Sequence, residues 1–273
     1  MTPITADFRP HRSVTHLKPL ITLLVGILVP TAISVADEAR GIDRLDRVAC
    51  IESQVPSQPN TRKLCSVFVV SAGARLFLVT AGHACAETSG ESRLRYRDAR
   101  GGSQWVTLRS LVPKSSNPWR RDPTSDFAIA EIHSREGNEV YLSHLDGLSI
   151  PLESLSSDTP RRTTPIVTIG FPLGMGIQDE VSPLAVVGHI ASRETLAESR
   201  WGNEPVVFCT PPLAQGTSGG PAFLASEAND SLTVIGMYIG VIRDSTGAKL
   251  SKMVPAHLIR KSIKSMIAES SVD

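Results

Sequence analysis

Short β-like segments separated by turn residues constrain the fold more than any other feature of this sequence. From about residue 60 onward, apolar and β-branched runs alternate with Gly, Pro, Asp and Ser. Many short strands at this spacing favour an all-β barrel or sandwich. The predicted strands are 66–70, 76–80, 93–97, 105–111 and 127–132 in the first half, and 166–169, 185–190, 206–209, 221–224 and 232–242 in the second.

Two other segments complete the predicted architecture. Residues 146–164 are polar and rich in turn residues, so we interpret them as the linker between the two halves. Near the end of the chain, Pro255 fits the first position of a helix. The apolar residues that then recur at helical spacing are Leu258, Ile259, Ile263, Met266 and Ile267. They predict an amphipathic C-terminal helix over about 255–267, packed on a barrel.

The stretch 215–224, which reads QGTSGGPAFL, is the first candidate for chemistry. It places Ser218 among three glycines. Glycine has no Cβ and reaches backbone angles that other residues do not, so such a loop can direct its N–H groups at one point beside the serine oxygen. That is the geometry of an oxyanion hole. The same composition is also ordinary turn chemistry, so the functional interpretation requires a base and an acid elsewhere.

One of the seven histidines is placed where a catalytic base could act. His83 stands in the sequence LVTAGHAC, directly after a predicted strand and a turn of small residues. The strand end gives a rigid platform, and the small neighbours leave the ring uncrowded. Among the other histidines, His11 and His16 precede the folded part. The remaining four, which lack a local context that suggests chemistry, are His133, His144, His189 and His257.

Two aspartates compete for the role of the acid that orients the histidine. Asp126 opens the apolar segment DFAIAEI, where a carboxylate would be buried beside the imidazole. Asp122 lies in a loop rich in Arg and Pro, where a solvated turn aspartate is expected. Because the orienting acid of a catalytic triad is desolvated, we predict Asp126 for this role.

The order and spacing of these residues match one known type of catalytic triad. His83, Asp126 and Ser218 follow one another with gaps of 43 and 92 residues, and trypsin-type triads have the same order with gaps of about 45 and 93. Over about residues 60–268, the chain resembles chymotrypsin/trypsin-fold serine proteases, especially the bacterial Deg/Htr type. The matching motifs are LVTAGHA (78–84), DFAIA (126–130), IGFPLGMG (169–176), GTSGGP (216–221), VIG (234–236) and MVPAHLIR (253–260).

This resemblance implies an all-β fold of two six-stranded antiparallel barrels, with the site in the cleft between them and a C-terminal α-helix. We expect a protease domain over 45–270, with barrel one at about 60–145 and barrel two at about 165–253. The resemblance implies a serine endopeptidase that works through an acyl-enzyme. Ser218 would be the nucleophile, His83 the general base and acid, and Asp126 the orienting group. The N–H groups of Gly216 and Ser218 would form the oxyanion hole.

The chain departs from its relatives at two points. Trypsin-like zymogens have an aspartate immediately before the serine, which pairs with a newly cut N-terminus. Thr217 occupies that position here and cannot form an ion pair, so we predict no activation by N-terminal cleavage. Deg/Htr proteases usually carry a PDZ domain after the protease, whereas only 55 residues follow Ser218. We therefore expect no PDZ domain.

The resemblance also predicts a substrate pocket. Its floor in trypsin-like enzymes lies six residues before the serine, where this chain has Pro212 and no acid that could hold Arg or Lys. Its wall strand would contain Tyr238, Ile239 and Gly240. These residues predict a small or medium apolar side chain immediately before the cut.

The first 36 residues have the pattern of a secretory signal peptide. A basic leader that includes Arg9, Arg12 and Lys18 precedes an apolar or small segment from Leu20 to Val35, and small residues at 34 and 36 fit a cleavage site. We expect an exported protein, periplasmic or secreted. The alternative is a membrane anchor over 20–36, although about 16 apolar residues are fewer than the roughly 20 that span a bilayer.

Four cysteines follow this leader, and three disulfide connectivities are possible. Cys65 and Cys85 flank a predicted hairpin, so we favour that pair, and Cys50–Cys209 follows by elimination. Export makes disulfides possible. No pair of cysteines has metal-ligand spacing, so we expect no metal site.

Composition limits the partners. The chain has 273 residues, 41% hydrophobic and 20% charged, with a net charge of +1. We see no basic stripe with interleaved aromatic residues and expect no nucleic acid partner and no cofactor. The expected partners are peptides or unfolded proteins, with a membrane involved only if the leader is uncleaved. Two alternative functions are a latent or non-catalytic binding protein with a protease fold, and a serine esterase on the same scaffold.

Overall fold

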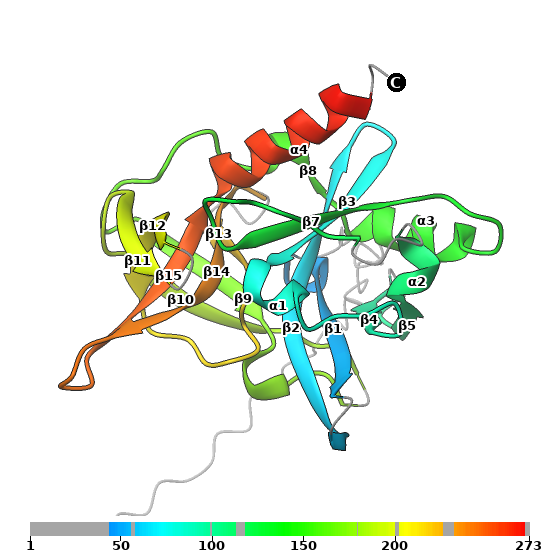
Figure 1. Cartoon of the computed structure of the whole chain (residues 1–273), viewed down its shortest axis with the longest axis horizontal. Helices are drawn as coiled ribbons and strands as arrows, with labels where there is room; N and C mark the ends of the chain where they lie inside the picture. The colour runs from blue at the N-terminus through cyan, green and yellow to red at the C-terminus, as the bar shows by residue number, and fades with distance from the viewer. Residues whose placement is uncertain are drawn as a thin grey trace, which may run out of the picture. The chain divides into compact units, whose positions relative to one another are not determined.

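The computed structural model describes residues 44–55, 58–98, 100–112, 118–178, 180–199, 202–225 and 232–270. The predicted signal peptide at 1–36 lies outside the described residues. The described part of the chain folds into two mainly antiparallel sheets followed by a helix (Figure 1). The predicted all-β class with a C-terminal helix is therefore confirmed.

The first sheet has eight strands, in the order β5-β4-β1-β2-β3-β7-β6, with β8 paired to β2. The six longer strands match the predicted number for this barrel, and the two-residue strands β6 and β8 are additional. β1 begins before residue 60, the predicted start of barrel one. The strands are β1 (Val48–Val55), β2 (Gln58–Ala72), β3 (Arg75–Ala81), β4 (Arg93–Arg97), β5 (Ser103–Thr107), β6 (Arg120–Arg121), β7 (Phe127–Ile132) and β8 (Ile150–Pro151).

The second sheet has seven strands, in the order β10-β9-β13-β14-β15-β12-β11. β10 also pairs with β12, so this sheet closes on itself. β11 lies beyond the closure and raises the number above the predicted six. The strands are β9 (Pro165–Gly170), β10 (Leu184–Ile190), β11 (Thr195–Ser199), β12 (Gly202–Thr210), β13 (Pro221–Leu224), β14 (Val234–Arg243) and β15 (Lys249–Pro255).

The structure differs from the predicted elements in two ways: the strands β1, β6, β8, β11 and β15 were not predicted, and several helical segments were not predicted either. The helical segments are η1 (Arg44–Arg47), α1 (Gly82–Cys85), α2 (Leu108–Leu111), α3 (Glu139–Leu148), η2 (Leu152–Ser154), η3 (Pro172–Gly174) and α4 (Ala256–Ser270). α2 replaces the second half of the predicted strand 105–111, because Leu108 and Leu111 bury one side of a helical turn while Arg109 is exposed. The predicted linker 146–164 begins inside α3 and includes β8 and η2.

Alternating side chains of β2 explain how the two sheets pack together. Val67 and Val69 point into a core inside the first sheet, whereas Phe68 and Val70 belong to a second core. That second core, here called the shared core, also contains Phe223 of β13 and residues of α4. Burying a large apolar side chain contributes roughly 1.5–3 kcal/mol. The shared core therefore stabilises the packing of the two sheets against each other.

The C-terminal helix follows the predicted pattern. α4 begins directly after Pro255, and its Ile259 and Ile263 are buried in the shared core. Leu258, Met266 and Ile267 are partly buried against the same core. Within the described ranges, no helix combines the length and apolar character needed to cross a bilayer.

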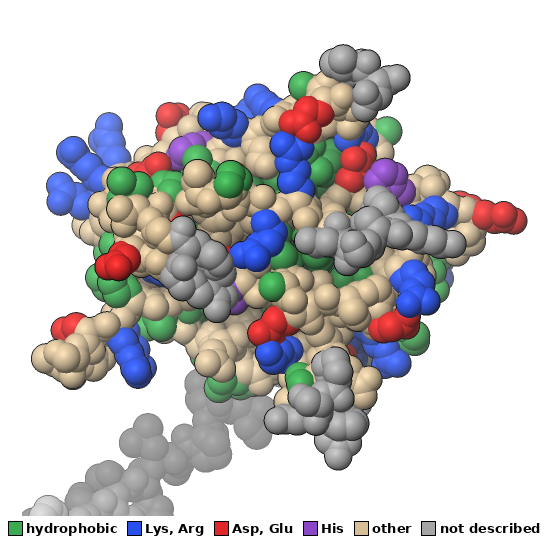
Figure 2. Space-filling view, viewed as in Figure 1, with side chains coloured by type: hydrophobic (Ala, Val, Ile, Leu, Met, Phe, Trp, Pro, Cys, Tyr) green, Lys and Arg blue, Asp and Glu red, His purple; other side chains and the backbone are tan. Residues whose placement is uncertain are grey.

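Charged side chains of both signs are spread over the face of the molecule that Figure 2 shows, with hydrophobic side chains between them. The exposed large hydrophobic residues include Trp105, Val187 and Leu196, which lie on three different strands. Isolated apolar residues of this kind are normal on a protein surface.

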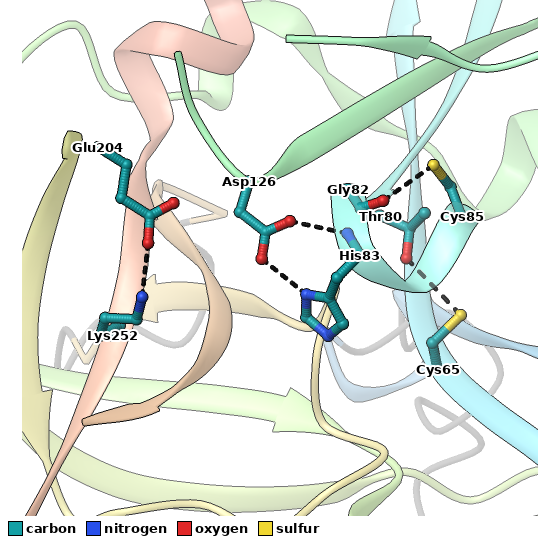
Figure 3. Close-up of polar contacts among 8 residues, drawn as sticks. All are labelled: Cys65, Thr80, Gly82, His83, Cys85, Asp126, Glu204 and Lys252. Atoms are coloured by element: carbon teal, nitrogen blue, oxygen red, sulfur yellow. Dashed lines mark hydrogen bonds and ion pairs between the residues drawn. The ribbon is translucent and has the colours of Figure 1, made fainter. Parts of the chain in front are cut away.

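The structure contradicts the predicted disulfide between Cys65 and Cys85. Both cysteines are free and buried. Their sulfur atoms have different partners (Figure 3): Cys85 Sγ donates to the carbonyl of Gly82 at 3.2 Å, and Cys65 Sγ accepts from Thr80 Oγ1 at 3.8 Å. Burial raises the pKa of the Cys85 thiol to about 11 and that of Cys65 to about 12. Both thiols are therefore protonated near neutral pH.

The predicted Cys50–Cys209 disulfide is also wrong, because both residues are free and buried. Cys50 lies on β1 of the first sheet and Cys209 on β12 of the second. The two residues belong to different buried clusters, Cys50 to the shared core and Cys209 to the interior of the second sheet. Assignment by elimination could not reveal this separation.

Candidate active site

Strand pairing in the first sheet brings His83 and Asp126 together. β3 and β7 are antiparallel, and Ala81 at the end of β3 lies opposite Phe127 at the start of β7. His83 follows β3 in the single turn of α1, and Asp126 immediately precedes β7. Asp126 Oδ1 accepts from the backbone N–H of His83 at 2.7 Å, and Oδ2 lies 2.6 Å from His83 Nδ1 (Figure 3). One carboxylate therefore fixes both the backbone and the ring of the histidine.

Gly82 allows this close approach. A Cβ at position 82 would lie 2.9 Å from Asp126 Oδ1 and 3.1 Å from the backbone nitrogen of Phe127. The Gly82 N–H also donates to the Asp126 carbonyl at 3.0 Å. Any larger residue here would push the carboxylate away from His83.

The pair has the chemistry of a base and its orienting acid. Asp126 is only 6% exposed, and an ionised carboxylate only accepts hydrogen bonds. We therefore assign the proton to Nδ1 of His83, which leaves the Nε2 lone pair free to take a proton. Asp122 has a different role, because its Oδ1 accepts from the N–H and the hydroxyl of Thr124, each at 2.8 Å.

Ser218 faces the same cavity as His83. The cavity has a volume of about 530 Å³ and is also lined by Gly216, Leu173 and Lys63. The Ser218 carbonyl accepts from the N–H of Ser66 on β2 at 2.9 Å. Among the described residues, no hydrogen bond joins the hydroxyl of Ser218 to the ring of His83. Such contacts are often loose before substrate binds.

The backbone around Ser218 leaves two donors without acceptors. Across the described ranges, neither the N–H of Gly216 nor that of Ser218 donates to a protein acceptor. Between them, Thr217 is 2% exposed, and its Oγ1 has no hydrogen-bond partner in the described part of the chain. Two free N–H groups one residue apart, one of them the N–H of the serine itself, are the arrangement that can stabilise an oxyanion.

The four residues predicted to form a substrate pocket do not line this cavity. Pro212 is exposed, whereas Tyr238 and Ile239 are 3% and 4% exposed. The hydroxyl of Tyr238 donates to the carbonyl of Leu213 at 2.8 Å. The Tyr238 ring therefore spans the space between β14 and the segment that contains Pro212. Gly240 has φ of +145° and lies on β14 two residues beyond Tyr238.

The described histidines outside the site have other surroundings. His257 Nε2 lies 2.7 Å from Glu194 Oε2, and His144 Nδ1 lies 3.4 Å from the hydroxyl of Tyr96. In the part of the chain that the structure describes, no three His, Cys, Asp or Glu side chains are grouped so as to hold a metal ion.

Comparison with known proteins agrees with this arrangement. The profile of the trypsin-like peptidase domain matches residues 65–237. A search of the curated proteins found no match. The fold is similar to that of the MamO protease domain from Magnetospirillum magneticum in its apo form, with a TM-score of 0.55 and 15% identity over 80% of this chain and 96% of that one.

Two further solved structures are similar. The Rv3671c protease from M. tuberculosis in its active form matches with a TM-score of 0.53 and 19% identity, over 78% of this chain and 77% of that one. The HtrA-type protease AlgW with a tripeptide matches with a TM-score of 0.52 and 18% identity, over 83% of this chain and 62% of that one.

These findings define the class of the protein: a serine-protease fold with HtrA-type neighbours. The chain belongs to the trypsin-like peptidase domain family. No PDZ domain is present among the described residues.

Two residues beside the candidate oxyanion hole were not singled out from the sequence. Ser66 lies in the apolar run CSVFVV, and a polar residue within such a run is a usable signal of a specific contact. Leu173 lies in the motif IGFPLGMG, which supported the resemblance without a role for this residue. It has φ of +55°, a conformation that is rare for a leucine, and is 71% exposed.

Proposed function

We propose that this protein is a serine endopeptidase that cleaves peptides or unfolded proteins through an acyl-enzyme. The observation that carries the proposal is the Asp126–His83 pair, whose histidine lines the same cavity as Ser218. The membership in the trypsin-like peptidase domain family supports the same reaction class.

The residues of the site have distinct tasks in this reaction. Ser218 Oγ attacks the carbonyl carbon of the scissile bond while His83 Nε2 removes its proton. The N–H groups of Gly216 and Ser218 stabilise the oxyanion. His83 then gives the proton to the leaving amine, and the acyl group stays on Ser218. A water molecule, activated by the same imidazole, releases the acid. Asp126 orients the ring and stabilises the imidazolium.

The buried Tyr238 supports a preference for a small residue immediately before the cut. In trypsin-like enzymes, the substrate side chain immediately before the cut enters a pocket. The two sides of that pocket correspond here to the strand of Tyr238 and the segment that contains Pro212. Here the Tyr238 ring occupies that space, with its hydroxyl 2.8 Å from the carbonyl of Leu213. Ala and Gly fit such a site, and Leu or Phe requires the ring to move. We further propose that the basic and apolar leader directs export.

A second candidate is a latent protease-fold protein that becomes active when a partner rearranges its substrate pocket. The Tyr238 ring in the predicted substrate pocket favours this candidate. The two candidates differ in whether the isolated protein turns over a substrate.

One experiment separates these functions. The full chain and Ser218→Ala are treated with a fluorophosphonate probe, with casein and with a nitrophenyl ester. An endopeptidase labels at Ser218 and cleaves casein, and Ser218→Ala lowers turnover by on the order of 10⁶. Folded wild type that does not label indicates the latent protein. Ester turnover without cleavage of casein or of an Ala-rich peptide indicates an esterase.

A further inference from the structure

Ser66 is a buried serine that reaches both sides of the Ser218 loop from the first sheet. It is 0% exposed and lies on β2, 150 residues away from Gly216 in sequence. Its hydroxyl donates to the Gly216 carbonyl at 2.8 Å and accepts from the Phe171 N–H at 3.1 Å. Its backbone N–H donates to the Ser218 carbonyl at 2.9 Å. One residue therefore contacts the carbonyls of both residues of the candidate oxyanion hole.

The peptide groups on both sides of Gly216 are fixed by hydrogen bonds. The carbonyl of Gln215 accepts from the Leu173 N–H at 2.6 Å, and the carbonyl of Gly216 accepts from Ser66. A trans peptide directs its N–H opposite to its carbonyl, so the Leu173 contact sets the direction of the Gly216 N–H. The Ser66 contact sets the orientation of the next peptide.

Without these contacts, Gly216 would have considerable freedom of rotation. Its φ is +93°, which glycine adopts easily, and a Cβ here would lie 2.3 Å from the carbonyl oxygen of Phe171. The position thus excludes larger residues, and glycine itself gives little intrinsic preference for one peptide orientation. The hydrogen bonds must supply that preference.

The hydroxyl of Ser66 links the contact at Gly216 to the contact at Gln215. It accepts from the N–H of Phe171, and two residues later the N–H of Leu173 donates to the Gln215 carbonyl. The Ser66 hydroxyl also donates to Gly216, so its single proton and one lone pair are both used. Thr80 Oγ1 donates to the Ser66 carbonyl at 2.8 Å and fixes the residue from the other side.

We propose that Ser66 is a positioning residue for the oxyanion hole, an inference that rests on the proposed function. Ser66 does not line the cavity that holds His83 and Ser218, so it acts through Gly216 rather than on the substrate. Its hydroxyl keeps the Gly216 N–H and the turn at Phe171–Leu173 in one arrangement. The Gly216 N–H can then meet the oxyanion of the transition state.

The test replaces Ser66 by alanine in the full chain and measures turnover of an Ala-containing peptide. We expect kcat to fall about 10–100-fold, because a misdirected oxyanion donor weakens transition-state binding. KM should stay within about twofold, since the ground-state contacts remain. The affinity for a peptide aldehyde, which forms a tetrahedral adduct with the serine, should fall by the same factor as kcat.

Two further variants keep the test decisive. Ser149→Ala is the matched control: it removes a buried hydroxyl that donates to the Asp146 carbonyl at 2.7 Å, at the end of α3, and should leave kcat and aldehyde affinity unchanged. If Ser66→Ala does not fold, Thr80→Val removes the hydrogen bond to the Ser66 carbonyl, together with the longer contact to Cys65 Sγ at 3.8 Å. We expect it to lower kcat by about threefold, with KM unchanged.

The outcomes distinguish this inference from the proposed function. Folded Ser66→Ala with wild-type kcat and aldehyde affinity would overturn the positioning role alone, as would a loss confined to KM. If Ser66→Ala does not fold, Thr80→Val with wild-type kcat would do the same. Wild type that neither cleaves the peptide nor binds the aldehyde would overturn both proposals. A loss in kcat and aldehyde affinity that Ser149→Ala does not share would support both.

Discussion

The two walls of the candidate site are built in different ways. On one wall, a single carboxylate fixes His83, and the two residues stand at the ends of neighbouring strands in one sheet. On the other wall, the loop that carries Ser218 is held by residues from elsewhere, namely Ser66 of the first sheet and Leu173 of the β9–β10 connection. The first wall is formed by two neighbouring strands of one sheet, and two hydrogen bonds to the same carboxylate hold His83. The second wall depends on contacts between distant parts of the chain.

This difference indicates where activity can be controlled. His83 has few alternative arrangements, because two hydrogen bonds hold it to one buried carboxylate. A glycine loop held by contacts from two other segments changes its arrangement when either segment moves. We therefore expect substitutions on the first wall to abolish catalysis, and substitutions on the second wall to alter its rate or its substrate preference.

The largest effect is expected on the first wall. Asp126→Asn keeps the shape but offers an amide to His83 Nδ1, which favours the wrong tautomer. We expect kcat to fall by about 10⁴, measured with an Ala-containing peptide at pH 7. Asp122→Asn is the matched control, since Asp122 only caps the turn at Thr124, and should keep kcat within about twofold. Equal losses in both variants would contradict the assignment of the acid.

The second wall is tested by Gly216→Ala. The new methyl would lie 2.3 Å from the Phe171 carbonyl oxygen, at φ of +93°. We expect a loss of kcat of about 10²–10³, as for removal of one oxyanion donor. Gly247→Ala has the same backbone strain at φ of +94° but no atom within 4 Å of the added methyl. It should cost stability without lowering kcat, and a shared loss of kcat would show that strain alone is responsible.

A smaller effect is expected at the substrate side of the second wall. Tyr238→Val removes the ring between β14 and the carbonyl of Leu213. We expect kcat/KM for Leu before the cut to rise at least about tenfold relative to Ala. Tyr238→Phe keeps the ring and removes only the hydroxyl, so it should retain the preference for Ala. An unchanged preference in Tyr238→Val would place the pocket elsewhere.

The smallest effect is expected from the cysteines. All four are free and buried, and burial raises the pKa of Cys209 to about 12. Purified under non-reducing conditions, the folded protein should react with no thiol reagent within minutes, and four thiols should react after unfolding in denaturant. Dithiothreitol should leave kcat and the melting temperature unchanged. If two or fewer thiols react after unfolding, the cysteines are not all free and a disulfide is present.

The first wall could be predicted from the sequence because its signals are local. His83 and Asp126 each stand next to an apolar strand, and strand pairing brings such positions together. The class of fold and the amphipathic face of α4 follow from the same kind of periodic pattern.

The second wall could not be predicted to the same depth. Ser66 and Gly216 meet only because two sheets pack together, and no local pattern encodes that contact. The disulfide predictions failed for a different reason. Cys65–Cys85 relied on positions that flank a hairpin and Cys50–Cys209 on elimination, and neither shows which partner a buried thiol contacts. The predicted pocket residues were placed by counting from Ser218, which does not reveal that the ring of Tyr238 turns toward Leu213.

Trapping the covalent intermediate tests most directly whether Ser218 is the nucleophile. Wild type is mixed with an Ala-containing peptide substrate, quenched in acid within the first turnover and analysed by peptide mapping with mass spectrometry. We expect one acyl group per chain, attached to Ser218, and none in Ser218→Ala. Peptide cleavage with no adduct on Ser218, and with full activity in Ser218→Ala, would contradict the assignment of Ser218 as the nucleophile.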